Sequence, residues 1–262
     1  MVPERRTPIL ERVLAPMALP ILMTSPQLGL LSGGLSTSGI AVVIGLLVIS
    51  LGIHEAAHAQ VALWCGDTTA RDLGRITLNP IPHIDPFMTI LLPLMLYFGS
   101  GGRMMFGGAK PVPVVYRNLR SPLRDMTLVA IAGPLSNFLL AVLFALVYRA
   151  FVLFGLYQEQ MMLEILLWGV NLNLLLAAFN LVPIPPLDGS RVMTWLLPDG
   201  LRRPYVELER YGMIILIVIL LLERNGFDLG FYRFVYWAMD GMRALSMDLT
   251  NPFIDLLRPL AG

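Results

Sequence analysis

One stretch of this chain combines membrane length with three ionisable side chains. Residues 40–63 read IAVVIGLLVISLGIHEAAHAQVAL. As a helix this stretch would extend about 36 Å, enough to cross a bilayer core of about 30 Å. His54, Glu55 and His58 stand within it. Because ionisable groups at this depth are costly unless they face a protein interior, their presence predicts a functional site.

The spacing of these residues predicts the chemistry of that site. Histidines four positions apart lie on one face of a helix, so both imidazoles can reach a single ion, and zinc is commonly bound in this way. A glutamate between them is placed to act as a base toward an attacking water. The chain holds only three histidines, so a chance match of two of them is the less favoured interpretation.

The composition is that of an integral membrane protein. Hydrophobic residues make up 56% of the chain and charged residues 14%, and the net charge of +1 gives no indication of nucleic-acid binding. The single cysteine, Cys65, excludes an internal disulfide framework, and we interpret it as a small packing residue. Residues 1–38 show no convincing cleavable signal peptide.

The apolar segments predict an all-α, multispanning helical bundle. The strongest candidate spans are 40–63, about 127–148, 163–182 and 211–222 with its flanks, whereas 87–98 is short and contains Pro93. We divide the chain into three parts. They are an N-terminal segment 1–38, with or without membrane association, a core 39–225, and a tail 226–262 that forms an amphipathic helix or a further membrane segment.

Basic residues predict the orientation. They are frequent in 64–125 and in 183–210, whereas 149–162 holds only Arg149. The positive-inside rule therefore places the first two regions in the cytoplasm and the third outside. It follows that 87–98 makes no net crossing, and that it re-enters the membrane or lies in the interface.

The same orientation brings a third candidate ligand toward the histidines. A catalytic zinc usually takes three protein ligands. Asp188 follows the apolar segment 163–182, which ends on the side where 40–63 also ends, so Asp188 can converge with His54 and His58. The alternative is that Asp188 only caps a short helix that begins at Gly189.

Three motifs together resemble the site-2 proteases, a family of zinc intramembrane metalloproteases. They are His54-Glu-Ala-Ala-His58, Ala132-Gly-Pro-Leu-Ser-Asn137 and Asn180-Leu-Val-Pro-Ile-Pro-Pro-Leu-Asp188-Gly189. Segments 74–86 and 108–114 resemble a compact prokaryotic branch without PDZ or CBS domains, and the resemblance covers roughly residues 40–225.

The resemblance implies that the HExxH helix and the Asp-Gly helix meet at a zinc site, with Asp188 as the third ligand and Glu55 as the catalytic base. It further implies an endopeptidase of the prokaryotic cytoplasmic membrane. Its expected substrate is a transmembrane helix of another membrane protein in the lipid bilayer, cut near the cytoplasmic face.

Several assignments remain open at the level of sequence. Asn180 either stabilises the oxyanion of a reaction intermediate or donates to the backbone carbonyls that the nearby prolines leave without a partner. For Asn137, helix packing is favoured over substrate positioning. His83 is either a structural loop residue or a group that assists the site. Segment 99–117 forms an edge for substrate or an interfacial loop. One rival function is a transporter or proton pathway, whose polar route would be lined by His54, Glu55, Asn173, Asn180 and Asp188. A catalytically silent membrane adaptor is the other rival.

Overall fold

The computed structural model describes residues 37–99, 107–156 and 158–260, and these residues form helices and turns but no strand. The predicted all-α membrane-type fold is thus confirmed. The long helices are α2 (Thr37–Trp64), α5 (Pro122–Leu153), α6 (Gln160–Asn180) and α10 (Phe231–Leu257). The shorter ones are α3 (Thr69–Asp72), α4 (Leu92–Gly99), α7 (Gly189–Leu196), α8 (Asp199–Glu207) and α9 (Gly212–Arg224). Short turns of helix lie at Ile81–His83, Pro86–Leu91, Tyr116–Asn118, Leu208–Tyr211 and Arg258–Leu260. The N-terminal segment, including residues 9–31, lies outside the described residues, so its membrane association stays a prediction.

Three described helices have the length and apolar composition to cross a membrane: Gly39–Trp64 in α2, α5 and α6. They correspond to three of the four predicted spans. The fourth prediction, 211–222 with its flanks, was wrong in length, because α9 has 13 residues and a span needs about 20. The reason is that the flanks are charged, and the preceding residues, with Arg202, Arg203 and Glu207, form the separate helix α8.

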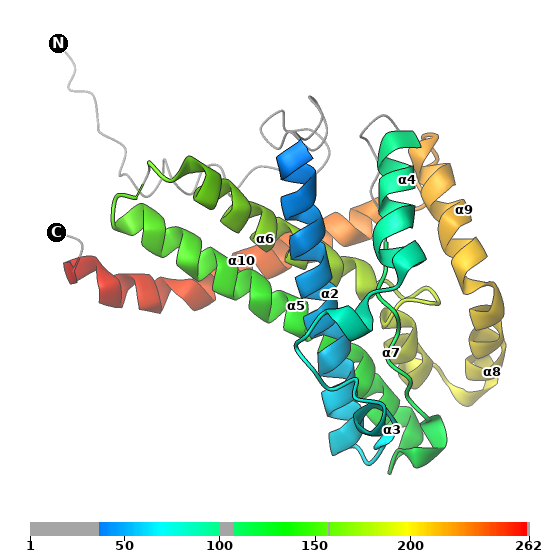
Figure 1. Cartoon of the computed structure of the whole chain (residues 1–262). Helices are drawn as coiled ribbons and strands as arrows, with labels where there is room; N and C mark the ends of the chain where they lie inside the picture. The colour runs from blue at the N-terminus through cyan, green and yellow to red at the C-terminus, as the bar shows by residue number, and fades with distance from the viewer. Residues whose placement is uncertain (1–36, 100–106, 157, 261–262) are drawn as a thin grey trace.

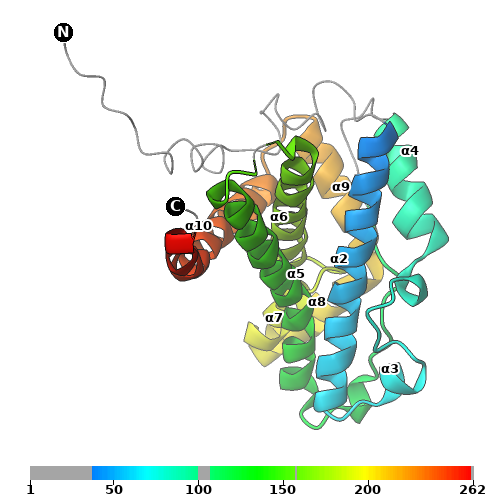
Figure 2. The ribbon, with the colours of Figure 1, turned by 60° about the vertical axis from the view of Figure 1, so that its left-hand side comes forward.

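Helix α5 packs against both α2 and α6 (Figures 1 and 2). Small side chains bring these helices together: Ala141 and Ala145 of α5 are fully buried beside Leu174 of α6. Gly169 of α6 lies so close to α5 that a Cβ there would be 2.7 Å from the ring of Phe144. Such close approach is the main source of helix association in lipid, where the hydrophobic effect between helices is absent.

The connection from α2 to α5 leaves the bundle and returns to the same end. The backbone N–H of Arg120 donates to the carbonyl of Cys65 at 3.0 Å, so the end of α2 and the start of α5 lie together. Between them the chain rises through α4 and comes back as an extended strand-like segment, residues 107–115 (Figure 1). The segment 87–98 therefore lies in a connection that leaves and returns to the same end of the bundle, which agrees with the prediction of no net crossing.

Asp67 holds this connection closed. Its buried carboxylate accepts hydrogen bonds from the N–H and hydroxyl of Thr69, from the N–H of Val115 at 2.6 Å and from the side chain of Asn118 at 3.0 Å. Burial by itself would raise the pKa of Asp67, but these hydrogen bonds outweigh it and hold the pKa below its ordinary value. The ionised carboxylate is thus the form that joins α2 to the returning segment.

Helix α10 crosses α5 and α6 and buries one face against them (Figure 2). That face begins with Phe231, Val235 and Met239 and continues with Arg243, Ser246, Thr250 and Ile254. Near the far end of α5, the buried guanidinium of Arg149 donates to the hydroxyl of Thr250 and to the carbonyl of Met247. The tail is therefore an amphipathic helix docked on the bundle through apolar contacts at one end and hydrogen bonds at the other.

Candidate metal centre

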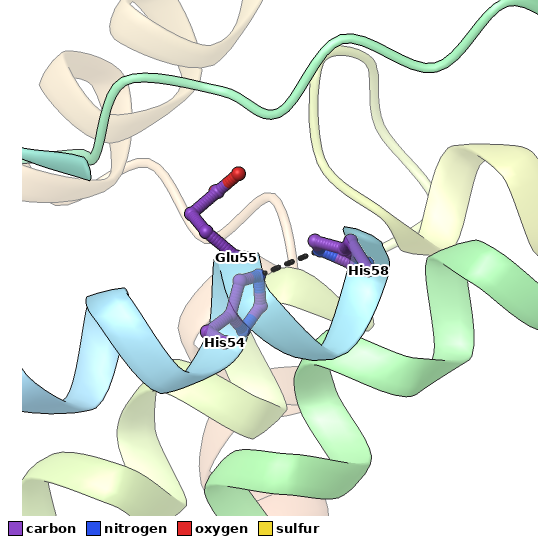
Figure 3. A group of neighbouring side chains, drawn as sticks. All are labelled: His54, Glu55 and His58. Carbon is purple, nitrogen blue, oxygen red and sulfur yellow. Dashed lines mark hydrogen bonds between the residues drawn. The ribbon is translucent and has the colours of Figure 1, made fainter. Parts of the chain in front are cut away.

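Helix α2 presents His54 and His58 on one face, one turn apart, as their spacing predicts. Their Nε2 atoms lie 3.0 Å apart, and the rings meet edge to face. Only 4% of His54 and 8% of His58 is exposed. Figure 3 shows both imidazoles on the side of α2 that faces α5, with Glu55 turned away from them.

Asp188 reaches the same point from the turn after α6. Its Oδ2 lies 3.2 Å from Nε2 of His54 and 3.4 Å from Nε2 of His58. Although Asp188 stands immediately before α7, its side chain makes no capping hydrogen bond. The carboxylate therefore faces the imidazoles, which disfavours the simple helix cap.

The approach of Asp188 depends on Gly189. A Cβ at this position would lie 2.2 Å from the backbone carbonyl oxygen of Leu181, so only glycine lets the turn fold this tightly. Leu187, on the other side of Asp188, is buried in the main apolar core. The Asp-Gly pair is thus fixed by packing on both sides.

The three atoms form a donor set that suits a cation. Nδ1 of His58 lies 2.7 Å from the carbonyl oxygen of Val129, which only accepts, so Nδ1 carries the proton there. Nδ1 of His54 likewise donates to Oδ1 of Asn137 at 2.6 Å. Both Nε2 lone pairs consequently point at each other and at Oδ2 of Asp188, a buried atom without a hydrogen-bond partner. This convergence of lone pairs fits zinc, whose ligands are deprotonated carboxylate and neutral imidazole.

The pKa of Asp188 depends on the charge of its neighbours. Burial raises it, whereas the positive charge of a protonated His58 or His54 lowers it below its ordinary value. A bound divalent cation would likewise favour the ionised carboxylate, which is the form that a metal ligand takes.

Gly133 of α5 makes room for the two imidazoles. A Cβ there would lie 2.5 Å from Cε1 of His54 and 2.5 Å from Cε1 and Nε2 of His58. Sequence reasoning did not assign this residue to the site. The available signal was the Gly133-Pro134 pair inside an apolar helix, where glycine is unfavourable unless close packing requires it.

Glu55 is bound by the returning segment. Its Oε2 accepts a hydrogen bond of 2.7 Å from the backbone N–H of Val112. A carboxylate oxygen of Glu55 also lies within 4.8 Å of a ring nitrogen of each histidine, a gap that one water molecule can bridge.

The segment carrying Val112 is held in place by buried groups. The guanidinium of Arg75 donates to the carbonyl of Lys110 at 2.6 Å, and the N–H of Lys110 donates to the carbonyl of His83 at 2.8 Å. His83 itself is 2% exposed, and its Nε2 contacts the carbonyl of Thr77 at 3.1 Å. It lies in the supporting loop rather than among the converging ligands.

The two asparagines from the sequence motifs take different positions. Asn137 is fully buried and contacts His54 directly, so it cannot face a substrate. Asn180 donates to the carbonyl of Leu176 in its own helix at 3.0 Å. That contact is of the backbone-satisfying kind, although its partner is not one of the carbonyls freed by the nearby prolines.

Comparison with known proteins places this site in a family. The model of peptidase family M50 matches residues 42–160 and 152–222. YwhC of Bacillus subtilis, which is named as a zinc metalloprotease, is 41% identical over 74% of this chain and 83% of its own length. Rip2 of Mycolicibacterium smegmatis, named likewise, is 31% identical over 77% of this chain and 73% of its own length.

Among solved structures none matches significantly. The sequence relatives nevertheless agree with the geometry, since the HExxH pair, its buried lone pairs and the membrane-length helices are the features such an enzyme requires. The prediction of zinc as cofactor is confirmed by these relatives and by the His-Glu-His group. The chain belongs to peptidase family M50, the site-2 proteases, and is an integral membrane zinc metalloprotease.

Proposed function

We propose that this protein is an intramembrane endopeptidase that cuts a transmembrane helix of a membrane-protein substrate. The observation that carries the proposal is the depth of the converging ligands. His54 and His58 lie ten and six residues before Trp64, the end of α2. This places them about 15 and 9 Å from that end of a membrane-length helix. A hydrolase centre at that depth acts on peptide bonds within the bilayer.

The residues divide the chemistry among themselves. His54, His58 and Asp188 would hold zinc, which when bound polarises a scissile carbonyl and lowers the pKa of water. Glu55 takes a proton from the attacking water and delivers it to the leaving amine. The N–H of Val112 holds one carboxylate oxygen of Glu55, so the other remains available for that transfer.

We infer that the active site opens toward the cytoplasm of a prokaryotic cell. The connection that joins the end of α2 near the site to α5 carries the basic residues Arg71, Arg75, Lys110, Arg117 and Arg120. Helices α7 and α8 add Arg191, Arg202 and Arg203. By the positive-inside rule this end is cytoplasmic, and the cut would fall within about two or three helical turns of the cytoplasmic end of the substrate span.

A helical substrate must unwind before it is cut, because its carbonyls are occupied by hydrogen bonds within the helix. Helix-destabilising residues such as glycine and proline in the substrate would lower that cost. Residues 107–115 run extended beside Glu55 and are pinned by Arg75 and His83. We propose that the unwound strand lies along this segment.

The rival transporter function is disfavoured by packing. Asn173, one of the residues that such a route would need, is fully buried, and its amide is occupied by the carbonyl of Gly169 and the side chain of Asn137. Groups that are already satisfied by protein partners do not line a water-filled route.

The test is cleavage of a reporter transmembrane helix by the purified protein in vesicles, with bound zinc quantified. Glu55→Gln should keep zinc and fold but lower turnover by about two or more orders of magnitude, because it lacks the proton-accepting oxygen. Mass spectrometry of the products should place the cut in the cytoplasmic half of the reporter. Normal turnover by Glu55→Gln, or a cut in the outer half, would refute the proposed mechanism or the proposed orientation respectively.

A further inference from the structure

Three buried side chains on three helices form one hydrogen-bonded line that ends at the metal centre. Nδ2 of Asn173 in α6 donates to the carbonyl of Gly169 at 2.9 Å, and Oδ1 of Asn173 accepts from Nδ2 of Asn137 in α5 at 3.0 Å. Oδ1 of Asn137 in turn accepts from Nδ1 of His54 in α2 at 2.6 Å. We call this line the amide relay. Asn137 and Asn173 have no exposed surface, so no solvent replaces any of its partners.

The relay has a fixed direction. The carbonyl of Gly169 can only accept, so the amide of Asn173 must point its NH2 group toward it and its oxygen toward Asn137. The NH2 group of Asn137 then faces Asn173, with the carbonyl of Ser50 as a second acceptor at 3.4 Å. This leaves the oxygen of Asn137 for His54, whose proton must sit on Nδ1.

The direction matters because His54 has two neutral tautomers. If the amide of Asn137 were reversed, its NH2 group would donate to Nδ1, and the proton of His54 would move to Nε2. That proton would then point at Oδ2 of Asp188 at 3.2 Å, which is a satisfactory hydrogen bond. The reversed state is thus a stable competitor that occupies the lone pair a metal needs.

His58 needs no such device. Its Nδ1 contacts the backbone carbonyl of Val129, which has no alternative orientation. The tautomer of His54, by contrast, depends on a side-chain amide that can rotate, and the orientation of that amide depends on Asn173. We propose that Asn173 is a positioning residue that sets the metal-binding tautomer of His54 through Asn137, a role that rests on the zinc site proposed above.

The chain offers a matched control in the same helix. Asn171 lies two residues before Asn173, is also buried, and donates to its own i−4 carbonyl, that of Leu167, at 2.9 Å. Its oxygen, however, accepts from Arg243 of α10 at 3.2 Å and has no contact with the relay. Leucine is close to asparagine in shape, so Asn173→Leu and Asn171→Leu remove equivalent groups without opening a cavity.

The direct readout is the protonation of the imidazole nitrogens. Since the chain has only three histidines, selective 15N-histidine labelling yields three residues to assign. In the full-length, metal-free protein, at a pH high enough for both imidazoles to be neutral, wild type and Asn171→Leu should show His54 and His58 protonated on Nδ1. Asn173→Leu should shift His54 toward the Nε2-protonated form and leave His58 unchanged.

Zinc affinity, measured by competition with a chelator, is the second readout. Asn173→Leu should bind zinc at least about 10-fold more weakly, in line with the loss seen when partners of metal-bound histidines are removed. Asn171→Leu should match wild type. Asn173→Asp should restore most of the affinity when its buried carboxyl is protonated, because it then donates to the carbonyl of Gly169 and keeps an oxygen toward Asn137. If Asn173→Leu does not fold, Asn173→Ala against Asn171→Ala makes the same comparison.

Equal His54 signals and equal zinc affinity in the Asn173 and Asn171 variants would overturn the positioning role. The proposed zinc site has a separate failure, namely a wild-type protein that does not bind zinc. The tautomer measurement is made without metal and therefore still decides the role of Asn173 in that case.

Discussion

The Gly133→Ala substitution tests how closely α5 must approach the two histidines. Carbon atoms in contact normally lie about 3.5–4.0 Å apart. The added Cβ would lie 2.5 Å from Cε1 of His54 and from Cε1 and Nε2 of His58. The imidazoles or the helix must therefore move by about 1–1.5 Å relative to each other.

The site cannot absorb that displacement. Each ring is held by a short hydrogen bond from Nδ1, 2.6 Å to Asn137 and 2.7 Å to Val129, so a ring that moves away loses its partner. Metal–ligand distances tolerate only about 0.2 Å. We expect zinc affinity to fall by about 100-fold, and cleavage to fall with it.

Alanine is favoured over glycine in a helix interior by about 1 kcal/mol, whereas the ring of Pro134 disfavours a Cβ on the residue before it, so the fold of the variant is checked by its thermal midpoint. The matched control is Gly45→Ala in α2, where an added Cβ meets no atom within 4 Å. Zinc content by atomic spectroscopy, zinc affinity and reporter cleavage are compared for both variants in the same detergent. Wild-type zinc affinity in a folded Gly133→Ala protein would refute the geometry described for the metal centre.

Two further predictions concern single carboxylates. Asp188→Ala should lower zinc occupancy markedly. Asp199→Ala, which removes a 92%-exposed carboxylate eleven residues later, should not. Equal zinc occupancy in the two variants would show that Asp188 is not a ligand and only precedes helix α7. Asp67→Asn should destabilise the protein by about 1–3 kcal/mol at neutral pH, because buried donors lose their charged acceptor. Since the folded pKa of Asp67 lies below its unfolded value of about 3.9, its contribution is present above that pH and is lost as the pH falls through the folded pKa. The gap in thermal midpoint between wild type and Asp67→Asn should therefore close on acidification, and a gap that persists in acid would contradict this role.

Much of this protein followed from the sequence because its strongest signals are local. The i, i+4 spacing of His54 and His58 determines a common helix face wherever that helix is placed, and membrane-length apolar segments determine spans. Charge distribution along the chain was enough to predict that 87–98 makes no net crossing. The prediction for 211–222 was wrong in length because hydropathy does not show where an apolar helix gives way to a charged one. Here the charged helix α8 and the turn Leu208–Tyr211 lead directly into the 13-residue α9.

Only the tertiary structure decided which distant groups meet at the site. Gly133 and Val112 have no reactive side chain, so the sequence does not mark them as site residues. Their roles follow only from the contact of Gly133 with the imidazoles and of the Val112 N–H with Glu55. Asn137 and Asn173 are polar residues in apolar helices, a pattern that predicts burial against another helix without naming the partner. Their roles depend on which way each amide points. That direction is set by a backbone carbonyl in α6, 115 residues along the chain from the histidine whose proton it determines.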